Sequence, residues 1–498
     1  MDQLLLANSP YHAPVLNISN KDHADKIKEL TKNFLHTKQN LLNVSKVFSE
    51  EIRSGLASDP PIKSSLIMAN TFVTQWPDGS ERGDYISLDL GSTNFRVVLS
   101  RFGVGGNGDG GSDGDGGDGG QGDKNEFKVK HYTVPTEYRR GQSSHLFNFF
   151  ADCIADFVAT YLPTNRGIAN SKPIPLGFTF SFPMIQQSIR SALLETWTKD
   201  FDCPDAVGQD AAQLLQQAID RHPSGALNVR LVAILNDATG TLVQGMHLDP
   251  MAAVGLILGT GSNACYVEKI QNVKYWKDRD QWLNSGQREV IIDMECGGFG
   301  DNGVIDWAKT PYDLSLDRES LFPNSYTFEK LFGGKFLGDI CRRVLVDLAT
   351  RGLAFGGKVT DELLTTEQFR SSDVTDVESG ADDQTYESIG KLLGYDHLSV
   401  DDREIIRYVC AIVSVRGAGM LAAILSNLIQ RIDDRPVVTI AIDGSVYKYH
   451  PKFHTLITDF IGQLLPDDCP KRFKLILAED GSGKGAGLVA AIAQRLNN

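Results

Sequence analysis

Three glycine-rich turns, each placed after an apolar stretch, are the parts of this sequence best suited to phosphoryl chemistry. They lie at residues 89–94, 259–263 and 443–445. Glycine lets backbone N–H groups approach a phosphate closely, and neighbouring hydroxyl groups can add hydrogen bonds. Phosphoryl transfer also needs a carboxylate near Mg²⁺ and a base for the attacking hydroxyl. One such turn is most often structural, so the prediction of a phosphate site rests on all three.

Asp237 is the candidate for the base. It follows the apolar stretch 231–235, and an aspartate at the carboxyl end of a strand is well placed for a cleft. There it could take the proton of an attacking hydroxyl. The alternative is that Asp237 only caps the helix that begins at Ala238. Glu295 and Glu329 could hold sugar hydroxyls, although each alone is typical of a surface carboxylate.

None of the three turns is a P-loop. The segment 481–485, Gly-Ser-Gly-Lys-Gly, lacks the hydroxyl residue after the lysine and the leading glycine at the required spacing. A nucleotide would therefore be held in a different manner. This glycine cluster opens the C-terminal helix, where it either lies near the nucleotide or permits close packing.

Strands that alternate with helices must position these residues, which indicates an α/β architecture. Helices are predicted to include 23–55, 144–161 and 402–431. Strands are predicted at 86–89, 95–102, 176–181, 231–235, 254–258, 290–293, 438–442 and 475–478.

Composition narrows the class of protein. The 498 residues allow two or more domains, and the net charge of -14 argues against a nucleic-acid-binding surface. No apolar run approaches the roughly 20 residues of a membrane helix, and no signal peptide is evident. Seven scattered cysteines without a Cys-x-x-Cys pair predict reduced thiols rather than disulfides or zinc. We therefore expect a cytosolic protein.

A glycine- and aspartate-rich insert occupies residues 103–123. It is too polar to pack, so we expect a disordered loop. The fragment 105–109 resembles one piece of a calcium-binding β-roll, but the stacked aliphatic copies of that motif are missing. A tolerated surface insertion is the favoured interpretation.

Together, the turns and their neighbours resemble the hexokinase family, most closely its single-unit animal form. The segment 176–183, Leu-Gly-Phe-Thr-Phe-Ser-Phe-Pro, looks like the family's sugar-binding signature, and Trp-Thr-Lys follows at 197–199. The further matching segments, in order, are 236–237, 259–266, 295–301, 329–335, 443–448 and 480–483. The match runs from about residue 23 to the C-terminus, and a chance match of the whole ordered set is very improbable.

The resemblance implies an α/β, actin-like ATPase (ribonuclease H-like) fold with two lobes around a cleft. We expect a flexible tail at 1–22, a helical segment at 23–77 that packs on the large lobe, and a small lobe at 78–235. The large lobe would span 236–484, and the C-terminal helix at 485–498 would return to the small lobe. Sugar binding would close the lobes and exclude water.

The resemblance also implies a function: ATP- and Mg²⁺-dependent phosphorylation of the 6-hydroxyl of glucose or a related hexose, the first step of glycolysis. Asp237 would be the base and Lys199 would approach the transferring group. Asp89 would hold Mg²⁺ through water. The sugar would be bound by Ser181, Phe182, Pro183, Thr198, Lys199, Asn236, Asp237, Asn263, Glu295 and Glu329. ATP would contact Asp89, Gly91, Ser92, Thr93, Asn94, Arg96, Gly259, Thr260, Gly261, Gly334, Lys335, Gly444 and Ser445.

Five residues depart from the family pattern. Ser92 and Asp200 stand where the family has glycine, and Ala238 stands where it has threonine. Cys296 replaces a tryptophan, and Asp293 replaces an asparagine. These residues flank the expected site, so slower transfer is a consequence to consider.

Two functions of different classes therefore remain: an active hexokinase, and a catalytically weak sugar-binding or sensing protein on the same fold. A chaperone-like or filament-forming ATPase is disfavoured by the full set of hexose-binding positions. We expect a monomer with no nucleic-acid partner and no membrane span. The N-terminus does not support docking on mitochondria.

Overall fold

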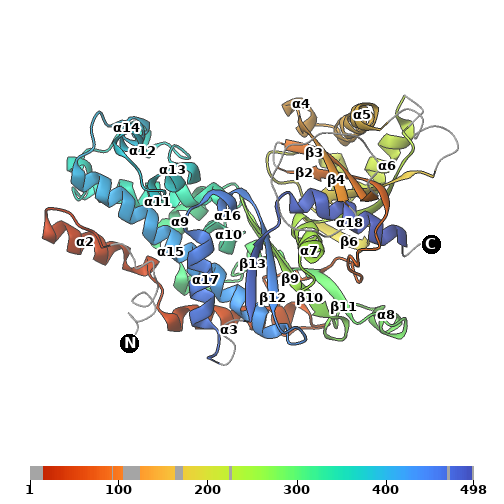
Figure 1. Cartoon of the computed structure of the whole chain (residues 1–498). Helices are drawn as coiled ribbons and strands as arrows, with labels where there is room; N and C mark the ends of the chain where they lie inside the picture. The colour runs from red at the N-terminus through yellow and green to blue at the C-terminus, as the bar shows by residue number, and fades with distance from the viewer. Residues whose placement is uncertain are drawn as a thin grey trace.

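The computed structural model describes residues 15–91, 94–104, 124–162, 172–223, 227–467 and 472–495. Two mixed β-sheets, each covered by helices, form the two halves of the molecule (Figure 1). We call the half built on the five-stranded sheet the small lobe, and the half built on the six-stranded sheet the large lobe. Residues 1–14 of the expected tail and 105–123 of the insert lie outside the described residues.

The small lobe contains the sheet of order β4-β3-β2-β5-β8. Its strands are β2 (Gly83–Leu90), β3 (Asn94–Val104), β4 (Lys124–Thr133), β5 (Ile174–Phe180) and β8 (Val229–Leu235). β2, β5 and β8 are parallel, whereas β3 and β4 are antiparallel to their neighbours. The carboxyl ends of β2, β5 and β8 therefore share one edge of the sheet.

The large lobe repeats this plan. Its sheet has the order β1-β11-β10-β9-β12-β13, with β9, β12 and β13 parallel and β10 and β11 antiparallel. Its strands are β1 (Ala69–Asn70), β9 (Ala252–Leu258), β10 (Ser262–Lys269), β11 (Glu289–Asp293), β12 (Val438–Asp443) and β13 (Phe473–Leu477). The β9–β10 turn thus occupies the place in this sheet that the β2–β3 turn occupies in the other.

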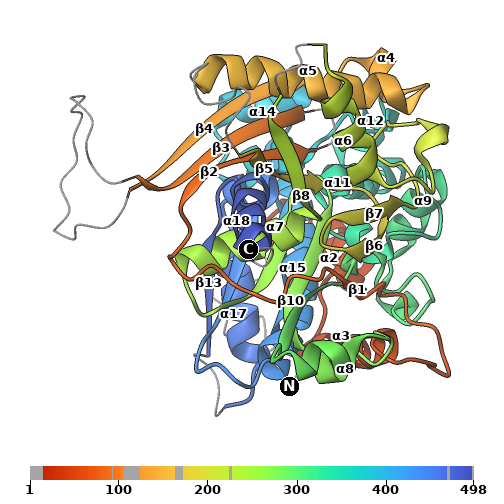
Figure 2. The ribbon, with the colours of Figure 1, turned by 90° about the vertical axis from the view of Figure 1, so that its right-hand side faces the viewer.

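Two helices lie between the sheets. α7 (Asp237–Leu248) packs on β9 and β12, and α18 (Gly481–Arg495) packs on α7 and on the strands of the small lobe. α5 (Ser143–Tyr161) and α6 (Ala211–Arg221) cover the opposite face of the small sheet (Figure 2). The C-terminal helix therefore contacts both α7 and the small sheet.

A thick helical layer completes the large lobe. The apolar α15 (Val400–Arg431) runs through its centre and is packed by α3 (Lys38–Gly55), α11 (Gly334–Thr350), α13 (Ser371–Glu378) and α17 (Phe453–Leu464). The remaining helices and strands are α2 (Lys21–Thr31), α4 (Thr136–Arg139), α8 (Arg279–Asn284), α9 (Pro311–Glu319), α10 (Thr327–Lys330), α12 (Asp361–Leu364), α14 (Asp383–Leu392), α16 (Ser445–Tyr449), β6 (Met184–Ser188) and β7 (Ser191–Leu194).

Three expectations need correction. The predicted helix 23–55 is two α-helices, because Leu35 is extended and Thr37 starts α3 with a capping box to Asn40. The described end of the expected tail is anchored at Leu16, which is buried, whereas residues 15, 17, 19 and 20 are exposed. Among the described residues, α15 is long and apolar enough to cross a membrane, and an 18-residue window within it has a mean hydropathy of 1.9. The expectation that no apolar run approaches the length of a membrane helix was therefore wrong. Every residue of that window is buried, as in a core helix.

Candidate functional site

Asn236 and Asp237 stand at the junction of β8 and α7. The side chain of Asn236 caps the helix, because its Oδ1 accepts from the backbone N–H of Ala238 at 2.9 Å. Asp237 is the first helical residue, and its Oδ1 accepts from the same N–H at 2.8 Å. The capping role therefore belongs to Asn236, and the half-buried carboxylate of Asp237 is available for other contacts.

The surroundings of Asp237 act on its pKa in opposite directions. Burial raises the pKa of this carboxyl, and the negative charge of Asp89 raises it as well. The ammonium group of Lys199 and a hydrogen bond from the Ser181 hydroxyl lower it. The net result is a pKa above the ordinary aspartate value, which suits a group that must accept a proton near neutral pH.

Lys199 lies in the loop that follows β7. Its Nζ donates to the backbone carbonyl of Ser181 at 2.7 Å and stands 5.5 Å from the ring centroid of Phe182. Its charge also lowers the pKa of Glu295 and Glu329, which burial raises. The lysine of the small lobe is therefore close to carboxylates of the large lobe.

A ring of four polar side chains lies beside Asp237. The Nδ2 of Asn263 donates to Oδ1 of Asp293 at 2.8 Å and to Oδ1 of Asn236 at 3.2 Å. The Nδ2 of Asn236 donates to Oε1 of Glu295 at 3.2 Å. The carboxyl groups of Asp293 and Glu295 interact with each other and complete the ring. Four residues that are spread over positions 236 to 295 of the sequence are thus linked in one polar cluster.

The two carboxyl groups of this ring have raised pKa values. Burial raises the pKa of Asp293 to about 7, and the nearby charge of Asp237 adds to the effect. Burial, followed by the charges of Asp293 and Asp237, holds the pKa of Glu295 well above its usual range. The backbone of Glu295 has φ +50°, a left-handed conformation that is rare for a non-glycine residue.

Glu329 belongs to α10, and its side chain contacts the backbone at the start of β10, beside the β9–β10 turn. Its Oε2 accepts from the backbone N–H of Ser262 at 2.8 Å. Burial raises the pKa of this carboxyl. These contacts and charge interactions bring together seven of the expected sugar ligands: Ser181, Lys199, Asn236, Asp237, Asn263, Glu295 and Glu329.

The other three expected sugar ligands differ from these. Phe182 is buried in an aromatic cluster with Phe180, Trp197 and Phe201. The Nζ of Lys199 lies over its ring. Pro183 accepts from the backbone of Glu195, and Thr198 is a half-buried neighbour of Lys199.

Asp89, at the end of β2, anchors a second polar cluster. It is 5% exposed, pairs with Arg96 of β3 and accepts from the hydroxyl of Ser482 at 2.7 Å. Arg96 also pairs with Asp480 at 2.6 Å. Gly91 is half-buried after Asp89, and Asn94 begins β3. Ser92 and Thr93 lie outside the described residues.

The remaining expected nucleotide ligands lie in contact with one another in the large lobe. The N–H groups of Gly334 and Lys335, at the start of α11, donate to the carbonyls of Gly259 and Thr260 at 2.9 Å each; Gly261 closes the β9–β10 turn. Gly444, which precedes Ser445, has φ +121°, and a Cβ there would meet the backbone of Leu258 at 2.4 Å. Only glycine therefore fits between β12 and the β9–β10 turn.

This arrangement fits a nucleotide with its magnesium ion. Glycine backbone at Gly259 and Gly444 leaves the edge of the large sheet without side chains, and Asp89 supplies a buried carboxylate from the small lobe. No three His, Cys, Asp or Glu residues in the described part of the chain are grouped to hold a metal ion. Magnesium is ordinarily held by one or two carboxylates and the substrate's phosphates, so a single carboxylate is an adequate protein contribution.

Four residues of these clusters were not assigned from the sequence: Asp293, Asp443, Asp480 and Ser482. Asp443 accepts from the N–H groups of Gly444 and Gly481, so it joins two of the glycine-rich segments. Asp443, Asp480 and Ser482 lie in the motifs that carry the family resemblance, which was the available signal. The role of Asp293 depends on strand register, because β10 and β11 pair Cys265 with Asp293.

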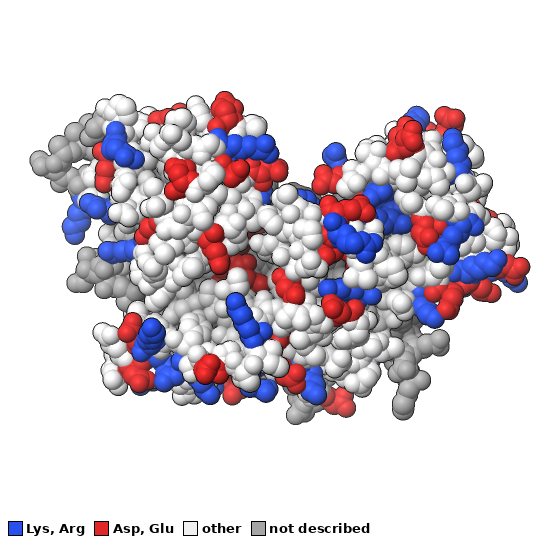
Figure 3. Space-filling model, turned by 180° about the vertical axis from the view of Figure 1, so that it is seen from behind, with Lys and Arg blue, Asp and Glu red and all other residues white. Residues whose placement is uncertain are grey.

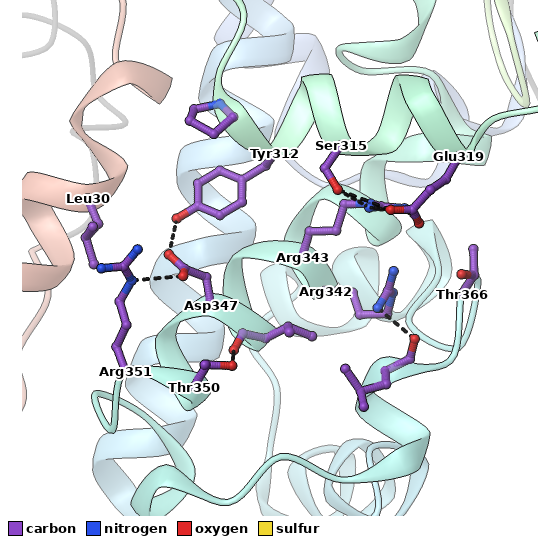
Figure 4. A pocket seen from close by; sticks show the side chains of 13 residues that line it. Leu30, Tyr312, Ser315, Glu319, Arg342, Arg343, Asp347, Thr350, Arg351 and Thr366 are labelled. Carbon is purple, nitrogen blue, oxygen red and sulfur yellow. Dashed lines mark hydrogen bonds and ion pairs between the residues drawn. The ribbon is translucent and has the colours of Figure 1, made fainter. Parts of the chain in front are cut away.

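The surface is hollowed between the two lobes, where Figure 3 shows Lys, Arg, Asp and Glu side chains interspersed. A separate cavity of about 530 Å³ lies on the large lobe between α2, α9, α11 and α12 (Figure 4). Its arginines already pair with carboxylates: Arg343 with Glu319, and Arg351 with Asp347. None of the expected site residues lines it.

Comparison with protein families supports the resemblance. Two models, both described as hexokinase, match residues 26–247 and 253–492. Hexokinase-2 of Rattus norvegicus is 35% identical over 484 residues, which are 96% of this chain and 49% of that protein. Hexokinase-1 of Homo sapiens is 35% identical over 485 residues, which are 95% of this chain and 49% of that protein. The chain thus spans about half the length of these relatives.

Solved structures agree in fold. A hexokinase from Schistosoma mansoni complexed with glucose superposes with a TM-score of 0.81 at 33% identity, covering 95% of this chain and all of that one. A second hexokinase crystal structure gives a TM-score of 0.76 at 27% identity, with the same coverage. The two-lobed, actin-like architecture expected from the sequence is confirmed.

Proposed function

The chain belongs to the hexokinase family, and we propose that it transfers the terminal phosphoryl group of ATP to the 6-hydroxyl of glucose or a related hexose. One observation carries this proposal. Asp237, a carboxylate at the carboxyl end of β8, is hydrogen-bonded to Ser181, held close to Lys199 and bordered by the amide and carboxyl groups of Asn236 and Glu295. That is the arrangement of a base within a polyol-binding site.

Asp237 is the general base in this proposal. Its carboxylate takes the proton of the 6-hydroxyl while the sugar oxygen forms a bond to the terminal phosphorus of ATP. The bond from that phosphorus to the bridging oxygen breaks, and ADP keeps the electron pair. Lys199 places a positive charge beside the transferring group, which offsets the negative charge that develops on its oxygens.

The sugar is held from both lobes. The carboxyl groups of Glu295 and Glu329 accept from sugar hydroxyls, and the amides of Asn236 and Asn263 supply further polar contacts. Ser181, Phe182, Pro183, Thr198 and Lys199 supply the small-lobe side. Because Lys199 lowers the pKa of Glu295 and Glu329 in the large lobe, closure of the lobes on a sugar strengthens these attractions by excluding water.

ATP lies between the backbone turns in this proposal, against Gly91–Asn94, Arg96, Gly259–Gly261, Gly334, Lys335, Gly444 and Ser445. Bound Mg²⁺ would neutralise charge on the transferring phosphates. Asp89 would hold the ion through water. It is itself fixed by Arg96 and Ser482.

We extend the proposal to the organisation of the chain. The small lobe spans 78–235, the large lobe 236–484, and residues 23–77 pack on the large lobe, with 485–498 returning to the small one. A cytosolic monomer is proposed as well. The free thiols at Cys153, Cys203, Cys265, Cys296, Cys341 and Cys410 are what a reducing compartment favours.

Turnover of the purified protein tests the proposal. With glucose and Mg-ATP it should release ADP and sugar 6-phosphate in equal amounts. Asp237→Ala should lower kcat by about 10²- to 10⁴-fold, while Asp220→Ala, an exposed carboxylate on α6, should leave kcat unchanged. Turnover by Asp237→Ala equal to that of the unsubstituted protein would overturn the assignment of the base.

Asp200 favours a second candidate, a catalytically weak sugar-binding protein. Its backbone has φ +67° directly after Lys199, and its carboxylate adds negative charge beside the transferring phosphates. Asp200→Gly removes both the charge and the strained conformation. Asp202→Gly, in extended backbone paired with Arg140, is the matched control. Glucose binding without turnover, with activity gained only in Asp200→Gly, would establish the second candidate.

A further inference from the structure

The ring formed by Asn236, Asn263, Asp293 and Glu295 has a consequence for the protonation of its carboxyl groups. The inference rests on the proposed sugar site, because Glu295 is one of its ligands. Asp293 itself is 5% exposed and ends β11. It has no assigned part in the reaction.

The orientations of both amides in the ring are fixed by the backbone. The Oδ1 of Asn263 accepts from the N–H groups of Ala264 at 2.7 Å and Cys296 at 3.2 Å, so its Nδ2 must face the ring. The Oδ1 of Asn236 accepts from the N–H of Ala238, so its Nδ2 faces Glu295. Neither amide can flip without losing these bonds.

With the amides fixed, the hydrogens of the ring can be counted. Asn263 gives its two amide hydrogens to Asp293 and Asn236, and Asn236 gives one to Glu295. The remaining contact joins the carboxyl groups of Asp293 and Glu295. Two ionised carboxylates in contact repel each other, whereas one proton between them makes a hydrogen bond.

We propose that Asp293 and Glu295 share one proton in the sugar-binding form of the protein, and that Asp293 is thereby a positioning residue that holds Glu295 toward the sugar. Loss of this proton places two negative charges in contact beside Asp237. The Glu295 side chain then turns away from Asp293, and its geometry for a sugar hydroxyl is lost.

Among the described residues that act most strongly on the pair, acidic groups and thiols outnumber cations. α7 contributes Asp237, and α10 contributes Glu329. Cys265 of β10 and Cys296 beside Glu295 are thiols whose pKa values burial holds well above the usual range. Lys199 supplies the positive charge, and the neighbouring strand β1 contributes the uncharged Ala69 and Asn70. This surplus of acidic groups favours retention of the proton.

The shared proton makes sugar affinity depend on pH. Burial and the charges of Asp293 and Asp237 hold the pKa of Glu295 well above its usual range, and this higher pKa of the pair sets the pH at which the shared proton leaves. Below that pH the pair keeps its proton and binds sugar; above it, binding must take up one proton. The dissociation constant for glucose should therefore rise by about tenfold per pH unit on the alkaline side.

Asp293→Asn provides the decisive variant. The amide oxygen can still accept from Asn263, and the amide nitrogen can donate to Glu295, so the ring closes without a titrating proton. Calorimetry of glucose binding at alkaline pH, in two buffers of different ionisation enthalpy, should give an uptake of about one proton per sugar in the unsubstituted protein. The uptake should vanish in Asp293→Asn and persist in Glu289→Gln, the carboxyl at the other end of β11.

Equal proton uptake in Asp293→Asn and the unsubstituted protein would overturn the inference and leave the kinase proposal intact. Failure to bind glucose at all would instead contradict the proposed function. Infrared difference spectra of the sugar-free protein then decide the inference. The inference is supported if the unsubstituted protein shows a protonated carboxyl band that disappears as pH rises. The same band should be missing in Asp293→Asn and present in Glu289→Gln. Identical spectra for all three proteins refute it.

Discussion

At the scale of single residues, Asp237 takes its chemical character from groups that are distant in sequence. Ser181 follows β5, Lys199 lies after β7, and Asp89 is the next-to-last residue of β2. Burial raises the pKa of Asp237, while Lys199 and Ser181 favour its ionised form. The pKa of the base is therefore raised above that of an ordinary aspartate, which makes its ionised form a better proton acceptor.

The pH dependence of turnover follows from the raised pKa of Asp237. The base acts when it is ionised, so kcat/KM should fall as pH drops through that pKa, at a higher pH than an ordinary aspartate would show. Lys199→Met removes a charge that lowers this pKa, so the acid limb should move to higher pH, apart from any loss in maximum rate. Rate–pH profiles of both proteins measure the shift, and an unmoved limb would contradict the assigned interaction.

The sequence was informative about this site to different degrees. The glycine turns and Asp237 could be predicted, because their residue types and their places after apolar stretches indicate phosphate and proton chemistry. The ring around Asp293 could not, because it depends on the register that pairs Cys265 with Asp293 and on an amide, Asn263, oriented by two backbone N–H groups.

At the scale of elements, the contact of α18 with α7 is governed by small residues. A Cβ at Gly485 would meet the backbone oxygen of Gly240 at 1.8 Å, so the two helices touch through their backbones. The glycine cluster at 481–485 was expected either to lie near nucleotide or to permit close packing. The close packing is confirmed at Gly485, and the hydrogen bond from Ser482 to Asp89 keeps proximity to a nucleotide as a prediction.

Gly485→Ala should therefore separate α18 from α7. Overpacking of this kind costs about 1–3 kcal/mol of unfolding free energy, and displacement of Ser482 should raise the KM for ATP. Gly462→Ala in α17 is the control. There the added Cβ meets nothing within 4 Å, so the helix should gain about 0.5–1 kcal/mol. Denaturant unfolding and ATP kinetics measure both effects; equal stability of the two variants would refute the packing argument.

Arg416 of α15 fastens the N-terminal segment to the large lobe. Its side chain is fully buried, pairs with Asp313 of α9 at 2.6 Å and lies 4.6 Å from the ring centroid of Phe34. Arg416→Ala leaves Asp313 buried without its partner, which should cost about 3–5 kcal/mol.

Arg351→Ala is the control, because Arg351 pairs with Asp347 at the surface cavity (Figure 4). Loss of this exposed pair should lower the free energy of unfolding by about 0–1 kcal/mol. Thermal and denaturant unfolding compare the two. A loss of similar size in both variants would mean that burial of the Arg416 pair is not what anchors the segment.

Elements were predicted well where the apolar pattern was clear, and poorly elsewhere. The strand expected at 231–235 and the helix expected at 402–431 lie within β8 and α15. β4 was not predicted, since its alternating polar residues follow the insert. β10 was not predicted either, because its Ser-Asn start belongs to the glycine turn that precedes it.

At the scale of the whole molecule, the site is divided between two lobes, with Lys199 in one and Glu295 and Glu329 in the other. Saturating D-glucose should therefore draw the lobes together and reduce the radius of gyration measured by X-ray scattering. L-Glucose, which presents the same groups in mirror image, is the control ligand. An unchanged radius at a D-glucose concentration that calorimetry shows to be saturating would exclude closure.

The packing of α18 on the small sheet also sets an order in time. The hydroxyl of Ser482 reaches back to Asp89 over 393 residues of sequence. On a ribosome adding about 5–20 residues per second, β2 is made roughly 20–80 s before α18 exists. For that interval the face of the small sheet that α18 covers has no native partner. Chaperone capture of nascent chains should accordingly persist until residues 481–495 have left the exit tunnel.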